Sequence, residues 1–270
     1  MFETLAINPL WISFGPVVVI NAILLCSIVY YKLSGASEKY GSAEAARRSK
    51  SIFLSYFFKE WWLWLNEPIA QFFIRIGLTP NIISSIGFFL ACVAAWLFAI
   101  GLFGYAGWVM VFGATFDFFD GRVARLTNQM TRSGAFYDST IDRFGEAVCF
   151  LGVAYFFRDS WAFIFVIAAL IGSMMVSYTR ARGQAIGVDC NKGSMQRPER
   201  VVYLGVSSIL QPVATLLIMP FFNTELAFLV IAALLLMAVM TNATAIFRMI
   251  DIMKTLDAED RAKGENSTAL

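Results

Sequence analysis

Seven long apolar stretches dominate this sequence of 270 residues and restrict what it can fold into. A helix that crosses a bilayer needs about 20 mostly apolar residues, because its backbone polar groups must pair with one another in lipid. Hydrophobic side chains make up 59% of the chain, charged ones 15%, and the mean hydropathy is +0.67, which is too apolar for a soluble domain. We therefore expect an all-α integral membrane protein. The predicted spans are residues 11–31, 82–100, 105–119, 136–156, 161–178, 201–219 and 226–246.

Basic residues alternate between the two ends of these spans. The linker after the first span, residues 32–50, holds five Lys or Arg and two Glu, whereas the connections near residues 101–104, 158–160 and 222–225 are nearly free of Lys and Arg. Cytoplasmic loops carry an excess of Lys and Arg. We therefore expect an N-terminus outside the membrane, seven crossings and a cytoplasmic C-terminus. The first span has no preceding basic residue and is interpreted as a retained anchor.

A shorter apolar stretch, residues 51–65, is interrupted by Lys59 and Glu60 and followed by Pro68. It is too short to span the bilayer and predicts an amphipathic helix in the membrane interface. An ordinary packed amphipathic helix is the alternative. The residues that favour the interface are Trp61, Trp62 and Trp64.

These observations divide the chain into four parts. We expect a transmembrane anchor with its cytoplasmic linker, an interfacial amphipathic helix, a six-helix domain and a polar tail that is disordered. The corresponding residues are 1–50, 51–77, 78–256 and 257–270.

The sequence contains no histidine. That excludes a Ser-His-Asp triad, a His-ligated zinc site and a histidine acid or base. The four cysteines (Cys26, Cys92, Cys149 and Cys190) are scattered and form no C-x-x-C pair, so we expect neither disulfides nor a metal–thiolate site. Any chemistry must use carboxylates, basic groups, hydroxyls or these thiols.

Ionisable residues gather at the end of one predicted span and the start of the next. Asp117 and Asp120 are one helical turn apart, and Asp138 and Asp142 stand in the same relation on the following helix. Two antiparallel helices could direct all four carboxylates at one space, where they would repel one another unless cations held them. Oxygen ligands in this number suit two Mg²⁺ or Mn²⁺ ions and phosphoryl chemistry. The alternative is a cluster of salt bridges with the neighbouring arginines Arg122, Arg125, Arg132 and Arg143.

Small residues stand beside these carboxylates. Gly121, Ala124 and Gly134 leave room for a nucleotide or another backbone to approach closely. Arg125 supplies a planar donor for a phosphate. The region therefore predicts a site for a phosphorylated ligand.

The segment D-F-F-D-G-R-V-A-R, eight residues, G-A-F-Y-D-S-T-I-D resembles the signature of the CDP-alcohol phosphotransferase (CDP-alcohol phosphatidyltransferase) family, D-x-x-D-G-x-x-A-R-x8-G-x3-D-x3-D, at all eight fixed positions. The resemblance covers roughly residues 78–248, so the first span and its linker look like an addition to a six-helix core. The resemblance implies two divalent ions held by Asp117, Asp120, Asp138 and Asp142.

The resemblance also implies the roles of individual residues. Asp142 would act as the general base that takes a proton from an alcohol, which attacks a CDP-lipid and releases CMP. A T-P-N turn, residues 79–81, would help to bind the CDP-lipid, although Pro at a helix start is an ordinary alternative. The CDP-lipid residues implied in this way are Pro80, Asn81, Gly121, Ala124, Arg125, Thr131 and Gly134.

A second basic cluster lies at three later helix ends that share one side of the predicted membrane, and it consists of Arg180, Arg182, Arg197, Arg200 and Arg248. Arginine forks match the oxygens of a phosphate, so the cluster suits a phosphorylated acceptor, whereas an ordinary positive-inside excess is the alternative. This part resembles the prokaryotic phosphatidylinositol-phosphate synthases, with Arg180 standing where that group has Lys. The acceptor-phosphate residues implied are Ser177, Arg180, Arg200 and Arg248.

The leading expectation is transfer of a phosphatidyl group from CDP-diacylglycerol to inositol 1-phosphate, giving CMP. Phosphatidylglycerophosphate synthesis or another reaction of the same family is the first alternative, and a cation-coupled transporter is a remote one. The expected partners are CDP-diacylglycerol, a soluble phosphorylated alcohol, membrane lipid and a second copy of the chain, with no nucleic acid. The expected location is a prokaryotic cell membrane, with the active site facing the cytoplasm.

Overall fold

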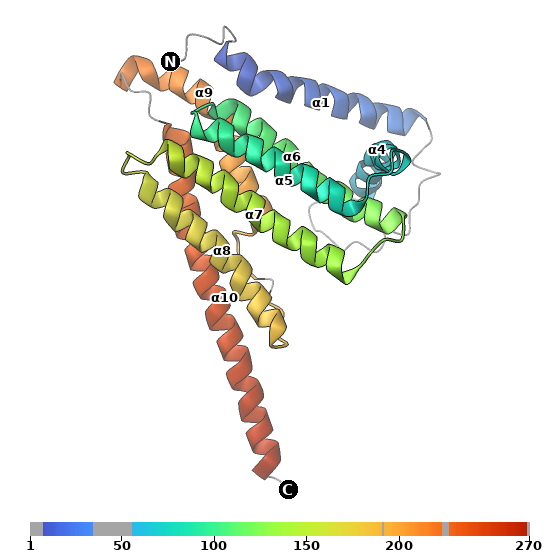
Figure 1. The fold of residues 1–270 in the computed structure, drawn as a ribbon, viewed down its shortest axis with the longest axis vertical. Coiled ribbons are helices and arrows are strands. Elements are labelled where there is room, and N and C mark those ends of the chain that lie inside the picture. Colours follow the sequence, from blue (N-terminus) through green and yellow to red (C-terminus); the bar gives the residue numbers. More distant parts are fainter. Residues whose placement is uncertain (1–7, 35–55, 191, 223–226, 269–270) are drawn as a thin grey trace. The chain divides into compact units, whose positions relative to one another are not determined.

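The computed structural model describes residues 8–34, 56–190, 192–222 and 227–268. These residues form eight helices and no strand, which confirms the all-α prediction (Figure 1). Most of the predicted linker, residues 35–50, lies outside the described residues. The helices are α1 (Pro9–Leu33), α4 (Tyr56–Arg75), α5 (Pro80–Ala99), α6 (Phe103–Leu126), α7 (Arg132–Phe156), α8 (Phe163–Ala185), α9 (Arg197–Phe222) and α10 (Phe228–Thr268).

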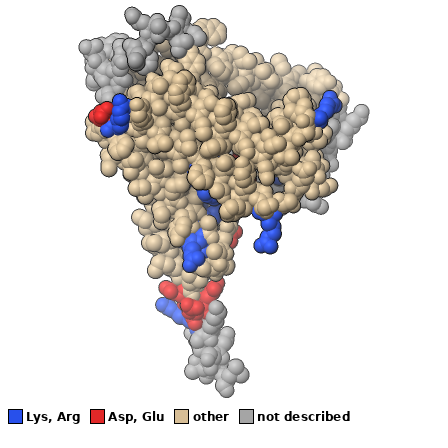
Figure 2. Space-filling model, in the orientation of Figure 1, with Lys and Arg blue, Asp and Glu red and all other residues tan. Residues whose placement is uncertain are grey.

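Each predicted span overlaps one helix along nearly its whole length. Within the described ranges, five helices are long and apolar enough to cross a membrane, namely α1, α5, α8, α9 and α10. The helices α6 and α7 have 24 and 25 residues, so each is about 36 Å long, but polar motif residues occupy one end of each. Crossing by α6 and α7 therefore stays a prediction. The predicted integral membrane character agrees with the visible face in Figure 2, which carries few charged side chains.

The chain forms two compact units. The first consists of Met1–Ile86 and Thr115–Ser139, and the second of Gly87–Ala114 and Thr140–Leu270. The boundary falls within α5, α6 and α7, so the start of α5, the end of α6 and the start of α7 belong to the first unit.

The first unit is built on aromatic packing between α4 and the end of α6. Ala70 and Val123 are fully buried there, and the ring of Phe73 meets Phe119 edge-on with centroids 5.5 Å apart. The helix α4 continues through Pro68, which follows the apolar stretch predicted to form the amphipathic helix. Its residues Trp61 and Leu63 are buried and Trp62 is exposed, so the predicted amphipathic helix is present. Its place in the membrane interface stays a prediction.

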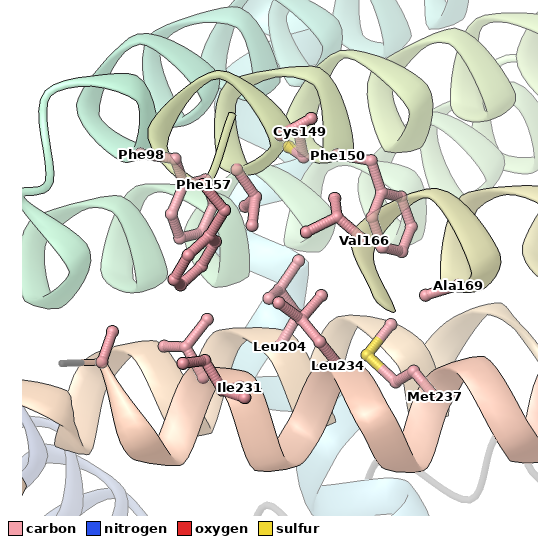
Figure 3. Packing of buried hydrophobic residues seen from close by; sticks show 14 of the residues in the cluster. Phe98, Cys149, Phe150, Phe157, Val166, Ala169, Leu204, Ile231, Leu234 and Met237 are labelled. Atoms are coloured by element: carbon pink, nitrogen blue, oxygen red, sulfur yellow. The ribbon is translucent and has the colours of Figure 1, made fainter. Parts of the chain in front are cut away.

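The second unit has one large apolar core, to which α5 to α10 contribute. Phe98, Phe150, Val166, Leu204 and Leu234 come from five different helices and meet there (Figure 3). Close backbone approach tightens this core, because a Cβ added at Gly152 of α7 would lie 2.1 Å from the carbonyl oxygen of Ala95 in α5. Small residues at helix contacts are typical of packing in membranes.

The polar tail is a helix in the structure, which corrects the prediction of disorder. The helix α10 continues without a break from the apolar segment through Thr268. The sequence after Asp257 contains Ala, Glu, Lys and Arg, which are strong helix formers, and no proline. A helix that is already nucleated by a packed segment extends at little cost through such residues.

Candidate active site

Three of the four motif aspartates come together in the first unit. Asp117 and Asp120 lie on α6 and Asp138 on α7, and one oxygen of each lies within 4.8 Å of the others. Asp120 is buried, Asp138 is half-buried and Asp117 is exposed. We call Asp117, Asp120 and Asp138 the carboxylate group.

Hydroxyl and backbone donors hold the buried member of this group. Ser84 Oγ of α5 donates a hydrogen bond of 2.6 Å to Asp120 Oδ2, and the Gly121 backbone N–H donates to Asp120 Oδ1. Ser84 is itself buried, and it lies one turn after Pro80 at the start of the same helix. Ser84 was not predicted as a site residue, although its spacing from the T-P-N turn places it on the same helix face as Pro80.

The chemistry of the carboxylate group fits a hard divalent cation. Three carboxylates this close repel one another, and a cation between them offsets the repulsion. Carboxylate oxygens are the ligands that Mg²⁺ and Mn²⁺ prefer. The arrangement is therefore suited to a metal ion and, through it, to a phosphate.

The residues predicted to bind a CDP-lipid also lie in the first unit. Thr131 is the residue before α7, and its Oγ1 accepts a hydrogen bond of 3.0 Å from the Gly134 backbone N–H, so it caps that helix. A Cβ added at Gly134 would lie 2.9 Å from Thr131 Oγ1 and 3.6 Å from Asn81 Oδ1. Because Gly134 has no side chain, the first turns of α5 and α7 can lie close together, beside the side chains of Asn81 and Thr131.

The remaining members of that predicted set lie along α5 and α6. Pro80 is the first residue of α5, where the preceding Thr79 accepts a 3.4 Å hydrogen bond from the Ile82 backbone N–H. On α6, Arg125 is exposed, and a Cβ added at Gly121 would lie 3.4 Å from its guanidinium Nη1. Ala124 is half-buried. The accessible guanidinium of Arg125 can meet a phosphate.

Asp142 has a different environment, because it belongs to the second unit. It lies one turn after Asp138 on α7, and its Oδ2 forms an ion pair with Nη1 of Arg197, the first residue of α9. Among the described residues, the group that could hold a metal does not include Asp142.

A second ion pair follows one turn further along both helices. Arg200 of α9 donates from Nε and Nη2 to the two carboxylate oxygens of Glu146 on α7, and from Nη1 to the Met195 carbonyl oxygen at 3.1 Å. The side chains of Arg200 and Glu146 are only 2% and 6% exposed. We call Asp142–Arg197 and Glu146–Arg200 the arginine pairs. The sequence placed Arg197 in the second basic cluster without a role of its own, and Glu146 was not predicted, although each stands one turn from a predicted site residue.

The other predicted acceptor residues lie on α8 and α10. Arg248 is 2% exposed and donates to the carbonyl oxygens of Lys192 at 2.7 Å and Val176 at 2.9 Å. Arg180 is exposed and Ser177 is half-buried. Arg248 therefore fastens the loop before α9 to α8, whereas Arg180 presents its guanidinium to the surroundings.

Comparison with known proteins identifies this arrangement. Residues 77–255 match the model of the CDP-alcohol phosphatidyltransferase family. Archaetidylinositol phosphate synthase of Pyrococcus horikoshii is 34% identical over 148 residues, which are 54% of this chain and 78% of the relative. Archaetidylinositol phosphate synthase of Methanothermobacter thermautotrophicus is 31% identical over 190 residues, covering 70% of this chain and 89% of the relative.

Solved structures agree with the sequence relatives. The crystal structure of Mycobacterium tuberculosis phosphatidylinositol phosphate synthase with CDP-DAG bound matches with a TM-score of 0.61 and 27% identity, covering 70% of this chain and 93% of that one. The same enzyme in complex with manganese and citrate matches with a TM-score of 0.61 over 69% of this chain and 88% of that one. These matches confirm the membrane fold and an enzyme of the transferase class. The chain belongs to the CDP-alcohol phosphatidyltransferase family.

Proposed function

We propose that this enzyme transfers a phosphatidyl group from CDP-diacylglycerol to inositol 1-phosphate and releases CMP. The observation that carries the proposal is the carboxylate group, in which Asp117, Asp120 and Asp138 present oxygens within 4.8 Å of one another beside the residues predicted to bind a nucleotide. The names of the relatives, which make inositol-phosphate lipids, support the acceptor.

Two divalent ions, Mg²⁺ or Mn²⁺, would be held by the carboxylate group together with Asp142. A structural relative was solved with manganese, which supports the choice of ion. Bound there, such ions would neutralise the phosphate oxygens and polarise the phosphorus that is attacked. Ser84 keeps Asp120 Oδ2 oriented by donating to it.

Asp142 is the proposed general base. It accepts the proton of an acceptor hydroxyl as that oxygen forms a bond to the lipid-proximal phosphorus, and the bond from this phosphorus to the oxygen of CMP breaks. The ion pair with Arg197 would hold the Asp142 carboxylate in a fixed orientation.

The two substrates would be held by different parts of the chain. Pro80, Asn81, Gly121, Ala124, Arg125, Thr131 and Gly134 are proposed to hold the CDP-lipid. Ser177, Arg180, Arg200 and Arg248 are proposed to hold the acceptor phosphate. Of these cations, Arg180 is the exposed one, whereas Arg200 and Arg248 are engaged with protein acceptors. Glycerol 3-phosphate, another phosphorylated acceptor, is the alternative.

We further propose that residues 78–256 form the catalytic domain, that the active site faces the cytoplasm of a prokaryotic cell and that the enzyme is a homodimer. The loops that the sequence places on the side of the active site are rich in arginine, which supports the orientation.

An acceptor-competition assay tests this function. The purified enzyme, with CDP-diacylglycerol and Mg²⁺ or Mn²⁺, is offered inositol 1-phosphate, free inositol, glycerol 3-phosphate or serine, and CMP release is measured. We expect CMP with inositol 1-phosphate and little with free inositol, because the latter lacks the phosphate. Release only with glycerol 3-phosphate would contradict the acceptor. CDP-archaeol as the donor in a parallel series tests the lipid, since two relatives are archaetidyl enzymes by name.

A further inference from the structure

The helix α4 lies against the turns of α6 that carry two aspartates of the carboxylate group. Its residue Glu67 forms an ion pair through Oε2 with Nη2 of Arg122. The Arg122 and Glu67 side chains are 8% and 20% exposed, so the pair is largely removed from solvent. Arg122 directly follows Gly121 in the D-x-x-D-G-R segment. The family match begins at residue 77, so Glu67 lies outside it.

Aromatic contacts from α4 surround the same turns of α6. Phe73 stacks on Phe116 with centroids 6.1 Å apart and meets Phe119 edge-on at 5.5 Å. Trp62 meets the ring of Phe118 at 6.1 Å. These three phenylalanines are the immediate neighbours of Asp117 and Asp120 in the sequence. The helix α4 therefore contacts α6 on each turn from which the two carboxylates project.

The helix α4 is in turn fixed to the N-terminal helix. Trp61 Nε1 donates a 3.2 Å hydrogen bond to Ser27 Oγ of α1, and the ring of Trp64 lies 5.1 Å from that of the fully buried Tyr31. All of these contacts lie within the first unit. A series of side-chain contacts therefore links α1, through α4, to the end of α6 that carries Asp117 and Asp120.

We propose that Glu67 is a positioning residue for the carboxylate group, acting through Arg122. A guanidinium has a fixed planar set of donors, so a partner on α4 sets the orientation of the Arg122 side chain and of the helical turn that bears it. Loss of Glu67 would remove one partner of this largely buried guanidinium, two residues from Asp120, and so loosen the turn of α6 that bears the aspartates. The inference rests on the proposed metal role of the carboxylate group.

The test compares Mn²⁺ binding by the full-length protein in nanodiscs, followed by electron paramagnetic resonance, with CMP release by the same samples. Loss of a residue that orients metal ligands typically costs about 10–100-fold in metal affinity. We expect Glu67→Gln to weaken Mn²⁺ binding by at least about tenfold, with a parallel fall in kcat and little change in the acceptor KM. The reversed pair, Glu67→Arg with Arg122→Glu, should recover part of the affinity lost in Glu67→Gln.

Asp159→Asn is the matched control, because it removes an exposed ion pair. The side chains of its two members, Arg158 and Asp159, are 53% and 87% exposed. It should leave Mn²⁺ affinity unchanged. A lower unfolding temperature in Glu67→Gln with unaltered Mn²⁺ affinity would show a purely structural pair and overturn the inference. If Glu67→Gln does not fold, Arg122→Lys replaces it, because it keeps the charge and removes the planar set of donors, and unaltered Mn²⁺ binding in that variant would count equally against the inference.

The unaltered protein separates this inference from the proposed function. Mn²⁺ binding by the unaltered protein, together with normal binding by Glu67→Gln, would overturn the positioning role alone. A failure of the unaltered protein to bind Mn²⁺ would overturn the metal role and the positioning role together.

Discussion

The carboxylate group and the arginine pairs satisfy their charges in opposite ways. In the carboxylate group, three acids of like charge approach within 4.8 Å, and a serine hydroxyl and a backbone N–H hold the buried one. In the arginine pairs, each acid on α7 already has a cation on α9, and the Glu146–Arg200 pair is almost completely buried. The first arrangement suits a cation from outside the chain, whereas in the second each acid is paired with an arginine of the chain itself.

This difference separates a group of side chains that suits a ligand from a group whose charges are already paired within the protein. Like charges held together are costly without a ligand, so their convergence points to a cation. A buried ion pair with good geometry needs no ligand, and a phosphate bound by Arg200 would have to share the arginine with Glu146 or replace that glutamate. Asp142 has features of both groups. The sequence motif predicts it to be a metal ligand, and in the structure it forms an ion pair with Arg197.

The largest expected effect concerns Asp142. A general base contributes roughly 10²–10⁴-fold to a rate, so Asp142→Asn should lower turnover by about that factor. Binding of CDP-diacylglycerol should stay largely intact, because the carboxylate group is unchanged. CMP release at saturating substrates and equilibrium binding of the CDP-lipid measure the two quantities.

Arg197→Gln provides the control for this variant. It removes the ion pair but keeps the carboxylate, so its turnover should exceed that of Asp142→Asn. Equal losses in the two variants would assign Asp142 to the arginine pairs alone. A parallel loss of CDP-lipid binding in Asp142→Asn would instead assign it to metal holding.

The next effect tests whether Arg200 does more than neutralise Glu146. Arg200→Ala leaves a buried glutamate without its cation, and breaking a buried pair costs about 3–5 kcal/mol of stability. If Arg200 also meets the acceptor phosphate, the acceptor KM should rise far more than the KM for the CDP-lipid. Thermal unfolding in detergent and steady-state kinetics measure these effects.

Glu146→Gln is matched to Arg200→Ala, because it breaks the same pair and retains the guanidinium. We expect it to destabilise the protein and to change the acceptor KM less. Identical acceptor KM values in the two variants would show that Arg200 serves only the pair. The double variant Arg200→Met with Glu146→Leu should recover most of the stability, because apolar residues of similar volume can replace a buried pair.

The smallest expected effect concerns the contact between α1 and α4. Trp61→Phe removes the hydrogen bond to Ser27 and keeps an aromatic ring, so stability should fall by about 0.5–1.5 kcal/mol. Ser27→Ala should have a similar effect, and the double variant should cost little more than either change. Full additivity of the two changes would show that these side chains do not interact.

The sequence predicted well the features that depend on local patterns. Apolar stretches of sufficient length located the helices, and the spacing of Asp117, Asp120 and Asp138 located a group that α6 and α7 bring together. Both arguments use helical periodicity, which acts over a few residues. The end of α6 was less predictable, because the helix continues through polar residues whose partners lie elsewhere in the chain.

The partners of those residues could not be predicted, because they are distant in sequence. Ser84 lies 36 residues before Asp120, and Glu67 lies 55 residues before Arg122. The same separation explains why Arg200 was interpreted as a phosphate ligand and its partner Glu146, 54 residues before it, was missed. A sequence pattern shows that a charge is present, and tertiary packing decides which group neutralises it.

The length of α10 has a practical consequence. With 41 residues it extends about 60 Å, roughly twice the thickness of the hydrocarbon core of a bilayer. Acidic side chains gather over its far end, where Asp257, Glu259 and Asp260 are exposed (Figure 2). With the apolar first part of α10 in the bilayer, a fluorophore or surface tether attached near Arg261 would lie beyond the lipid or detergent. Enzyme immobilised in this way could be assayed repeatedly in one membrane patch while soluble acceptors are exchanged around it.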